Sequence, residues 1–83
     1  MSQGTKRLEQ MRRNPKNDWR IEDVEVVCRA AGVDCCPPSN GSHYGVAHSS
    51  QIDILTIPAD RPVKAVYIKK LVKFIDAVKG SKE

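Results

Sequence analysis

Two short strand-like runs joined by a polar connection restrict the fold of this chain more than any other stretch. Residues 52–58, Ile-Asp-Ile-Leu-Thr-Ile-Pro, are rich in β-branched and aliphatic side chains and end in a proline, which is typical of a short buried strand. In the preceding run, 43–48, neighbouring side chains point to opposite faces. The connection at 49–51, Ser-Ser-Gln, has the length of a hairpin loop. The two runs therefore predict an antiparallel hairpin that begins at His43.

Alternation along the first run separates the two histidines of the chain. Tyr44, Val46 and His48 share one expected face, and His43, Gly45 and Ala47 share the other. Because its neighbours on that face are small, His43 is expected to lie where a substrate or a packed helix comes close. The opposite orientations argue against a catalytic pair of histidines.

The segment 20–31 has the periodicity of an amphipathic helix. Its apolar positions follow the i, i+3, i+7, i+10 spacing of one helix face, and they are Ile21, Val24, Cys28 and Ala31. Asp18 is a suitable N-cap, and Gly32 is a natural C-terminal stop. Trp19 is expected to pack against the core at the helix entry rather than to stack on a base.

A wider apolar stripe predicts a helix that begins at Val63 or Ala65 and runs to Val78, with Gly80 ending it. The stripe consists of Tyr67, Ile68, Leu71, Phe74, Ile75 and Val78. The opposite face carries Lys69, Lys70 and Lys73.

Leu8 and Met11 form a thin stripe that predicts a short helix over 4–13, which Pro15 interrupts. A third short strand is expected at 33–36. The expected order is helix, helix, three strands, helix. This order predicts a small α+β domain with helices packed on one face of a three-stranded sheet.

Composition limits the class of protein further. The chain has 83 residues, 40% of them hydrophobic, which suits one small domain. Its formal net charge of +4 is compatible with a polyanionic partner. No run approaches the roughly 18 apolar residues that a membrane span needs, and no leader-like segment opens the chain. The sequence therefore predicts a cytoplasmic protein.

Three cysteines, Cys28, Cys35 and Cys36, are an odd number and do not form a disulfide framework. A zinc site from Cys35, Cys36, His43 and His48 lacks the usual Cys-x-x-Cys spacing. Reduced thiols are favoured over that site, and Cys28 is expected in the core because it falls on the apolar helix face.

The chain contains no P-loop, dinucleotide-binding glycine pattern, acidic metal cluster or nucleophile elbow. What remains, one histidine on a strand together with lysines, arginines and hydroxyls, suits RNA cleavage by the RNA's own 2′-hydroxyl. Histidine can take or give the proton, and a cation can stabilise the phosphorane oxygens. The alternative is that His43 is a structural residue of its strand.

Three segments resemble the HicA family of small mRNA-interferase toxins from bacterial type II toxin–antitoxin systems. They are Gly41-Ser42-His43-Tyr44, Leu55-Thr56-Ile57-Pro58 and Ile68-Lys69-Lys70-Leu71. The resemblance covers roughly residues 19–79. It implies a double-stranded-RNA-binding-like fold, with helix, three-stranded antiparallel sheet and helix. It also implies that His43 is the catalytic residue and that a HicB-type antitoxin masks the active site.

The resemblance divides the chain into an N-terminal helical extension at 1–18, a HicA-like ribonuclease domain at 19–80 and a tail at 81–83. With His43 as general acid or base, the expected contacts to mRNA come from Gly41, Ser42, Lys64, Lys69, Lys70 and Lys73. No metal and no other cofactor is expected.

Two positions depart from the family pattern. Asn40 stands where many members carry a basic residue, and Asp60 stands where many carry a histidine. Two alternatives therefore stay open beside the toxin. One is a degenerate toxin that retains only antitoxin binding, and the other is a non-catalytic RNA-binding module of the same small α+β fold.

Overall fold

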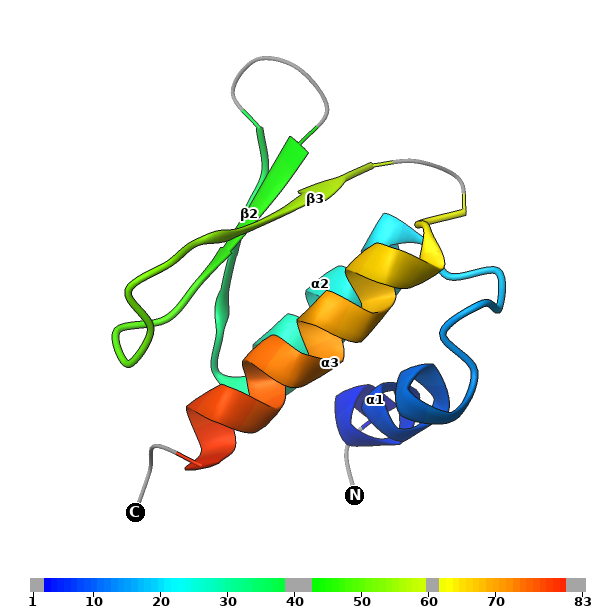
Figure 1. Cartoon of the computed structure of the whole chain (residues 1–83), viewed down its shortest axis with the longest axis horizontal. Helices are drawn as coiled ribbons and strands as arrows, with labels where there is room; N and C mark the ends of the chain where they lie inside the picture. The colour runs from blue at the N-terminus through cyan, green and yellow to red at the C-terminus, as the bar shows by residue number, and fades with distance from the viewer. Residues whose placement is uncertain (1–2, 39–42, 60–61, 81–83) are drawn as a thin grey trace.

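A computed structural model describes residues 3–38, 43–59 and 62–80 of the chain. Within this part, the helices are α1 (Gln3–Arg13), α2 (Ile21–Ala31) and α3 (Ala65–Gly80), and the strands are β1 (Asp34–Cys36), β2 (His43–Ala47) and β3 (Leu55–Pro58) (Figure 1). The predicted α+β class and element order are confirmed.

The strands form one antiparallel sheet with β2 in the centre, in the order β1-β2-β3. Cys35 of β1 lies opposite Val46 of β2, and His43 at the start of β2 lies opposite Pro58 at the end of β3. The predicted hairpin pairing is therefore correct.

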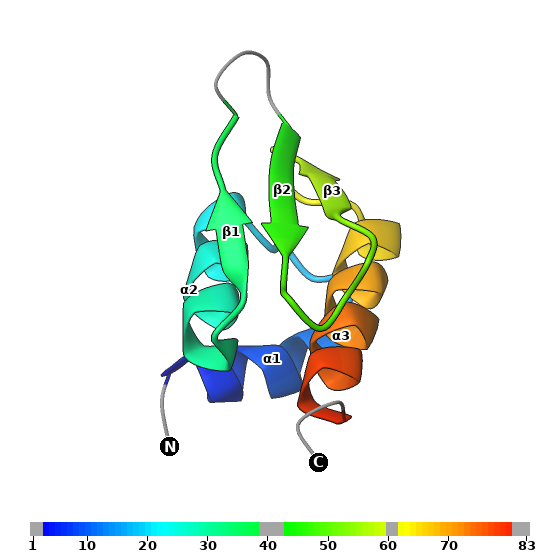
Figure 2. The same ribbon diagram turned by 90° about the vertical axis from the view of Figure 1, so that its left-hand side faces the viewer.

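The elements are arranged in three layers. The described helices lie on one side of the sheet, with α2 and α3 next to it and α1 on the far side of these two helices (Figures 1 and 2). Val46 and Ile57 supply the buried contacts of the sheet. The helices supply most of the remaining buried apolar side chains, which are Leu8, Met11, Val24, Val27, Cys28, Ile68, Leu71, Val72, Ile75 and Val78. The opposite face of the sheet is left without a helical cover among the described residues.

The predicted N-terminal extension shares this core. Leu8 and Met11 of α1 are both buried. Gly4 lies so close to α2 that a Cβ atom built on it would collide with the Cβ of Ala30. The first turn of α1 therefore depends on a residue without a side chain.

The predicted N-cap of α2 is wrong. The helix begins after Arg20 rather than Asp18, and the Asp23 carboxylate accepts a hydrogen bond from the Arg20 backbone N–H at 3.0 Å. The cause lies at Trp19, whose carbonyl accepts a hydrogen bond from Val63 N–H at 2.7 Å. Because the Trp19 carbonyl is hydrogen-bonded to Val63, in the segment that precedes α3, Trp19 stays outside the helix. The helix therefore starts later than the sequence predicts.

Two other predictions about α2 are confirmed. Trp19 is buried at the helix entry, where its indole N–H donates to the Asn14 carbonyl at 2.8 Å. Gly32 ends the helix with a φ of 72°, a left-handed conformation that glycine adopts without steric cost.

The prediction of a buried strand over 52–58 is wrong in its first half. The strand β3 begins at Leu55, whereas Ile52 is 100% exposed and Ile54 is 65% exposed. The connection between β2 and β3 therefore spans residues 48–54 and is longer than the predicted hairpin loop at 49–51.

A tight turn after β2 explains the difference. The Nδ1 atom of His48 accepts a hydrogen bond from the Ser50 backbone N–H at 3.0 Å and lies 2.7 Å from the Ser50 hydroxyl. The Gln51 N–H donates to the His48 carbonyl at 3.0 Å. These bonds fold the chain back at 48–51, so the next residues pass outside the ladder before β3 begins.

Candidate functional site

His43 occupies the first position of the central strand, opposite Pro58, and its side chain is exposed. Because side chains alternate along a strand and Val46 is buried, His43 points to the other face of the sheet, together with Gly45 and Ala47. Figure 2 shows this face toward the viewer, with the helices behind it. The predicted division of β2 into two faces is thus observed.

A loop side chain comes close to the His43 face at Gly45. A Cβ atom on Gly45 would lie 3.5 Å from the Cγ2 of Ile54, in the connection between β2 and β3. Next to Gly45 the neighbour on this face is therefore a loop side chain and not a packed helix.

The imidazole of His43 has no hydrogen-bond or ion-pair partner within the described parts of the chain. The predicted phosphate-positioning residues Gly41 and Ser42, and the departures Asn40 and Asp60, lie outside the described residues. An exposed imidazole on the open face of a sheet can exchange a proton with a ligand that reaches it.

His48 has a different position and role. Its Nδ1 atom accepts a hydrogen bond from the Ser50 backbone N–H and so forms part of the turn that follows β2. The two histidines of the chain therefore lie at opposite ends of β2, His43 at its first position and His48 just after its last. The ring of His48 is hydrogen-bonded within the turn.

The predicted RNA-binding lysines Lys64, Lys69, Lys70 and Lys73 are all exposed, and they follow the length of α3 instead of clustering at His43. Lys64 precedes the helix, and its backbone carbonyl accepts a hydrogen bond from the Tyr67 N–H at 2.9 Å. Lys73 lies about 12 Å further along the helix axis than Ala65. Lys70 places its ammonium 5.7 Å from the centre of the Tyr67 ring, a cation–π distance.

Two arginines of α1 form ion pairs that hold this helix against α2 and α3. Arg7 Nε lies 3.5 Å from Asp23 Oδ1 of α2, and Arg12 forms a closer pair with Asp76 of α3. The sequence shows a basic cluster in α1 but not these partners, because they come from distant parts of the chain.

The cysteines are free thiols, as predicted. Cys28 is fully buried, and this burial raises its pKa to about 12. Burial also raises the pKa of Cys35. No group of three or more histidine, cysteine, aspartate or glutamate side chains in the described part of the chain is arranged to hold a metal ion.

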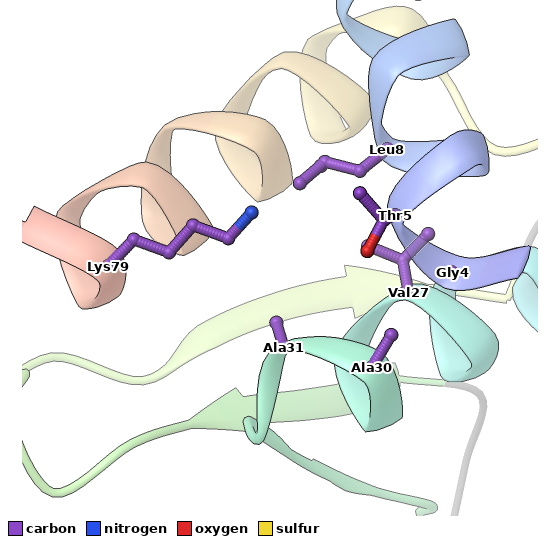
Figure 3. A pocket seen from close by; sticks show the side chains of 7 residues that line it. All are labelled: Gly4, Thr5, Leu8, Val27, Ala30, Ala31 and Lys79. Atoms are coloured by element: carbon purple, nitrogen blue, oxygen red, sulfur yellow. The ribbon is translucent and has the colours of Figure 1, made fainter. Parts of the chain in front are cut away.

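Cavities occur on several sides of the domain. A small one of about 70 Å³ lies where α1, α2 and α3 meet, with Thr5 and Lys79 on its wall (Figure 3). Another of about 180 Å³ lies between α2 and β1 and is lined by Glu25 and Arg29, among others. A groove of about 320 Å³ separates α3 from the loop before β3. His43 lines none of these three spaces.

Comparisons with protein-family models, with curated proteins and with solved structures find no match to this chain. Among the helices in the described residues, none has the length and apolar character needed to cross a membrane. Of the two histidines, His48 is hydrogen-bonded within the turn after β2, whereas the exposed imidazole of His43 has no partner among the described residues.

Proposed function

We propose that this chain is a HicA-type toxin that cleaves mRNA without a metal ion and uses His43 as its general acid or base. The observation that carries this proposal is the exposed imidazole at the start of the central strand, on the sheet face opposite the described helices. RNA, a long polyanion, can reach a side chain in that position without entering a cavity.

The reaction needs one proton removed and one supplied. The 2′-hydroxyl loses its proton and attacks the adjacent phosphorus, the bond from phosphorus to the 5′-oxygen breaks, and that oxygen leaves with a proton. The products are a 2′,3′-cyclic phosphate and a 5′-hydroxyl. His43 takes the first proton or gives the second, a role that contributes about 10²- to 10⁴-fold to the rate. Lysines of α3 attract the RNA backbone.

The order of elements supports the RNA-binding part of the proposal. The series α2, β1, β2, β3, α3 is the helix, three strands and helix expected of a double-stranded-RNA-binding-like domain. The helix α1 packs behind α2 and α3, so it leaves the His43 face open. A HicB-type antitoxin would silence the enzyme by covering that face, and the cytoplasm, where mRNA is translated, would be the place of action.

The test compares the wild type with His43→Ala and His48→Ala, because these variants remove the two histidines of the chain one at a time. Each purified protein is incubated with a defined RNA in EDTA, and the product ends are analysed. We expect cyclic-phosphate ends from the wild type and from His48→Ala, and none from His43→Ala with an unchanged circular dichroism spectrum. Full activity of His43→Ala would refute the proposal.

A second candidate, an RNA-binding module without catalysis, is favoured by the net charge of +4 and the exposed lysines along α3. Salt-sensitive RNA binding without cleavage by the wild type would select it. A toxin that has lost its activity through Asn40 and Asp60 would instead bind its antitoxin and cleave nothing.

A further inference from the structure

Two isoleucines project from the loop that connects β2 and β3. Ile52 is 100% exposed and Ile54 is 65% exposed, although both belong to a run whose composition is that of a buried strand. Single exposed apolar residues are common on protein surfaces, but two large ones beside an apolar groove are characteristic of an interaction site.

The groove of about 320 Å³ lies between this loop and the outer side of α3. Its apolar lining comes from Ile54 and Leu55 on one side and from Phe74 and Ala77 on the other.

Charged side chains border the same groove. Lys70 and Lys73 stand on the α3 side, and Asp53 stands on the loop side. Two ammonium groups against one carboxylate give the border a net positive charge. The lining and the border together favour an occupant that is apolar and acidic.

We propose that this groove binds a short segment of a partner protein in which large apolar side chains stand next to aspartate or glutamate. The apolar side chains would displace water from Leu55 and Phe74, and the carboxylates would meet Lys70 and Lys73. His43 does not line the groove, so the proposal does not depend on ribonuclease activity.

A protein segment fits better than a small ligand or RNA. Ile52 is not part of the groove lining, so a small ligand in the groove would leave its side chain in water. RNA would bring phosphates toward Asp53 and toward an apolar lining. In addition, β3 is an edge strand of the sheet, with no second neighbour among the described residues, and a peptide backbone can bond to such an edge.

Titration of the ¹⁵N-labelled full chain with defined peptides of about six residues tests the proposal. The probe alternates leucine and glutamate. A leucine–lysine peptide reverses its charge, and a serine–glutamate peptide removes its apolar side chains. We expect the leucine–glutamate peptide to shift the amide signals of residues 51–55 and 70–77, and the two control peptides to leave them in place.

Variants locate the contact. Lys70→Glu combined with Lys73→Glu is expected to weaken peptide binding about tenfold, and Ile54→Ser is expected to weaken it to a similar degree. Lys69→Glu and Val66→Ser are the matched controls. They change an exposed lysine and a 50% exposed valine of α3 that do not line the groove, and they should leave the affinity unchanged.

Three results would overturn the proposal. The first is that the leucine–glutamate peptide leaves the groove signals unshifted, or binds no better than the leucine–lysine peptide. The second is that oligouridylate RNA shifts these signals while the peptide does not. The third is that sedimentation equilibrium shows a dimer that Ile54→Ser dissociates, which would make a second copy of this chain the occupant.

Discussion

Arg12 of α1 and Asp76 of α3 form a two-point ion pair although they lie 64 residues apart in the chain, with Nη1 2.6 Å from Oδ2 and Nη2 2.9 Å from Oδ1. The hydrogen bond from Arg12 holds the pKa of Asp76 below its ordinary value, and the hydrogen bond to Asp76 raises the pKa of Arg12. The pair thus joins the N-terminal helix to the C-terminal one.

Asp76→Asn is expected to lower the free energy of unfolding by about 0.2–1 kcal/mol near neutral pH, because both partners are partly exposed and water weakens such pairs. Since the pKa of Asp76 is lower in the folded chain than in the unfolded chain, the stabilisation is complete above about pH 5. It is lost as the pH falls through the folded-state pKa. Urea unfolding of both proteins over a pH series should show the difference shrinking in acid.

Glu9→Gln is the control for this measurement. Glu9 contacts Arg12 at a single point, 3.5 Å from Nε, within the same helix. Its replacement should change stability less than Asp76→Asn does. A difference between wild type and Asp76→Asn that stayed constant down to acidic pH would contradict the role given to the pair.

Gly4→Ala tests the close approach of α1 to α2. The added methyl group would collide with Ala30 and would lie 2.8 Å from the Val26 carbonyl oxygen, so the helices must separate. We expect a net loss of about 1–3 kcal/mol, even though alanine favours helix formation by up to about 1 kcal/mol. Thermal unfolding measures the loss.

Gly45→Ala provides the matched comparison, since a Cβ atom there would make only an ordinary contact of 3.5 Å with Ile54. This variant should be neutral or slightly stabilising, because glycine weakens a strand interior. If both alanine variants were equally stable, the close packing of α1 on α2 would be refuted.

The three thiols should react in a fixed order with a disulfide reagent such as Ellman's reagent. Cys36 is exposed and should react first, and Cys35 should follow slowly because burial raises its pKa. Cys28, with a pKa of about 12 and no exposed surface, should react only on unfolding. Cys36→Ser should remove the fast phase, and a fast phase that survives it would contradict this order.

The sequence predicts those parts of the fold that local signals determine. Helical periodicity identifies α2 and α3, the glycine after α2 marks its end, and alternation along β2 assigns His43 to one face and Val46 to the other. The sequence also predicts that His43 begins a strand, but the central position of that strand in the sheet is seen only in the structure.

The other features depend on residues that are distant in the chain. The packing of α1 requires Asp23 and Asp76 as partners of its arginines, and neither is adjacent to it in sequence. The groove likewise depends on segments that are distant in the sequence. The sequence predicts Lys70 and Lys73 as RNA contacts on a charged helix face, and only the folded chain brings the apolar loop next to them.

Composition alone does not separate Ile52 from Ile57, because both belong to the same strand-like run. In the structure, Ile57 is fully buried in β3, whereas Ile52 lies entirely in water beyond the turn made by His48. Ile57→Ala is therefore expected to cost about 2–5 kcal/mol of unfolding free energy, because it leaves a cavity in the core.

Ile52→Ala deletes the same atoms at a position where they contact no core residue, so it should change stability by less than about 0.5 kcal/mol. Urea unfolding of both variants measures the two losses of unfolding free energy by the same method. Equal losses from the two substitutions would show that the whole run from 52 to 58 is a buried strand, as its composition predicts. Such a result would also remove the exposed surface on which the proposed peptide groove depends.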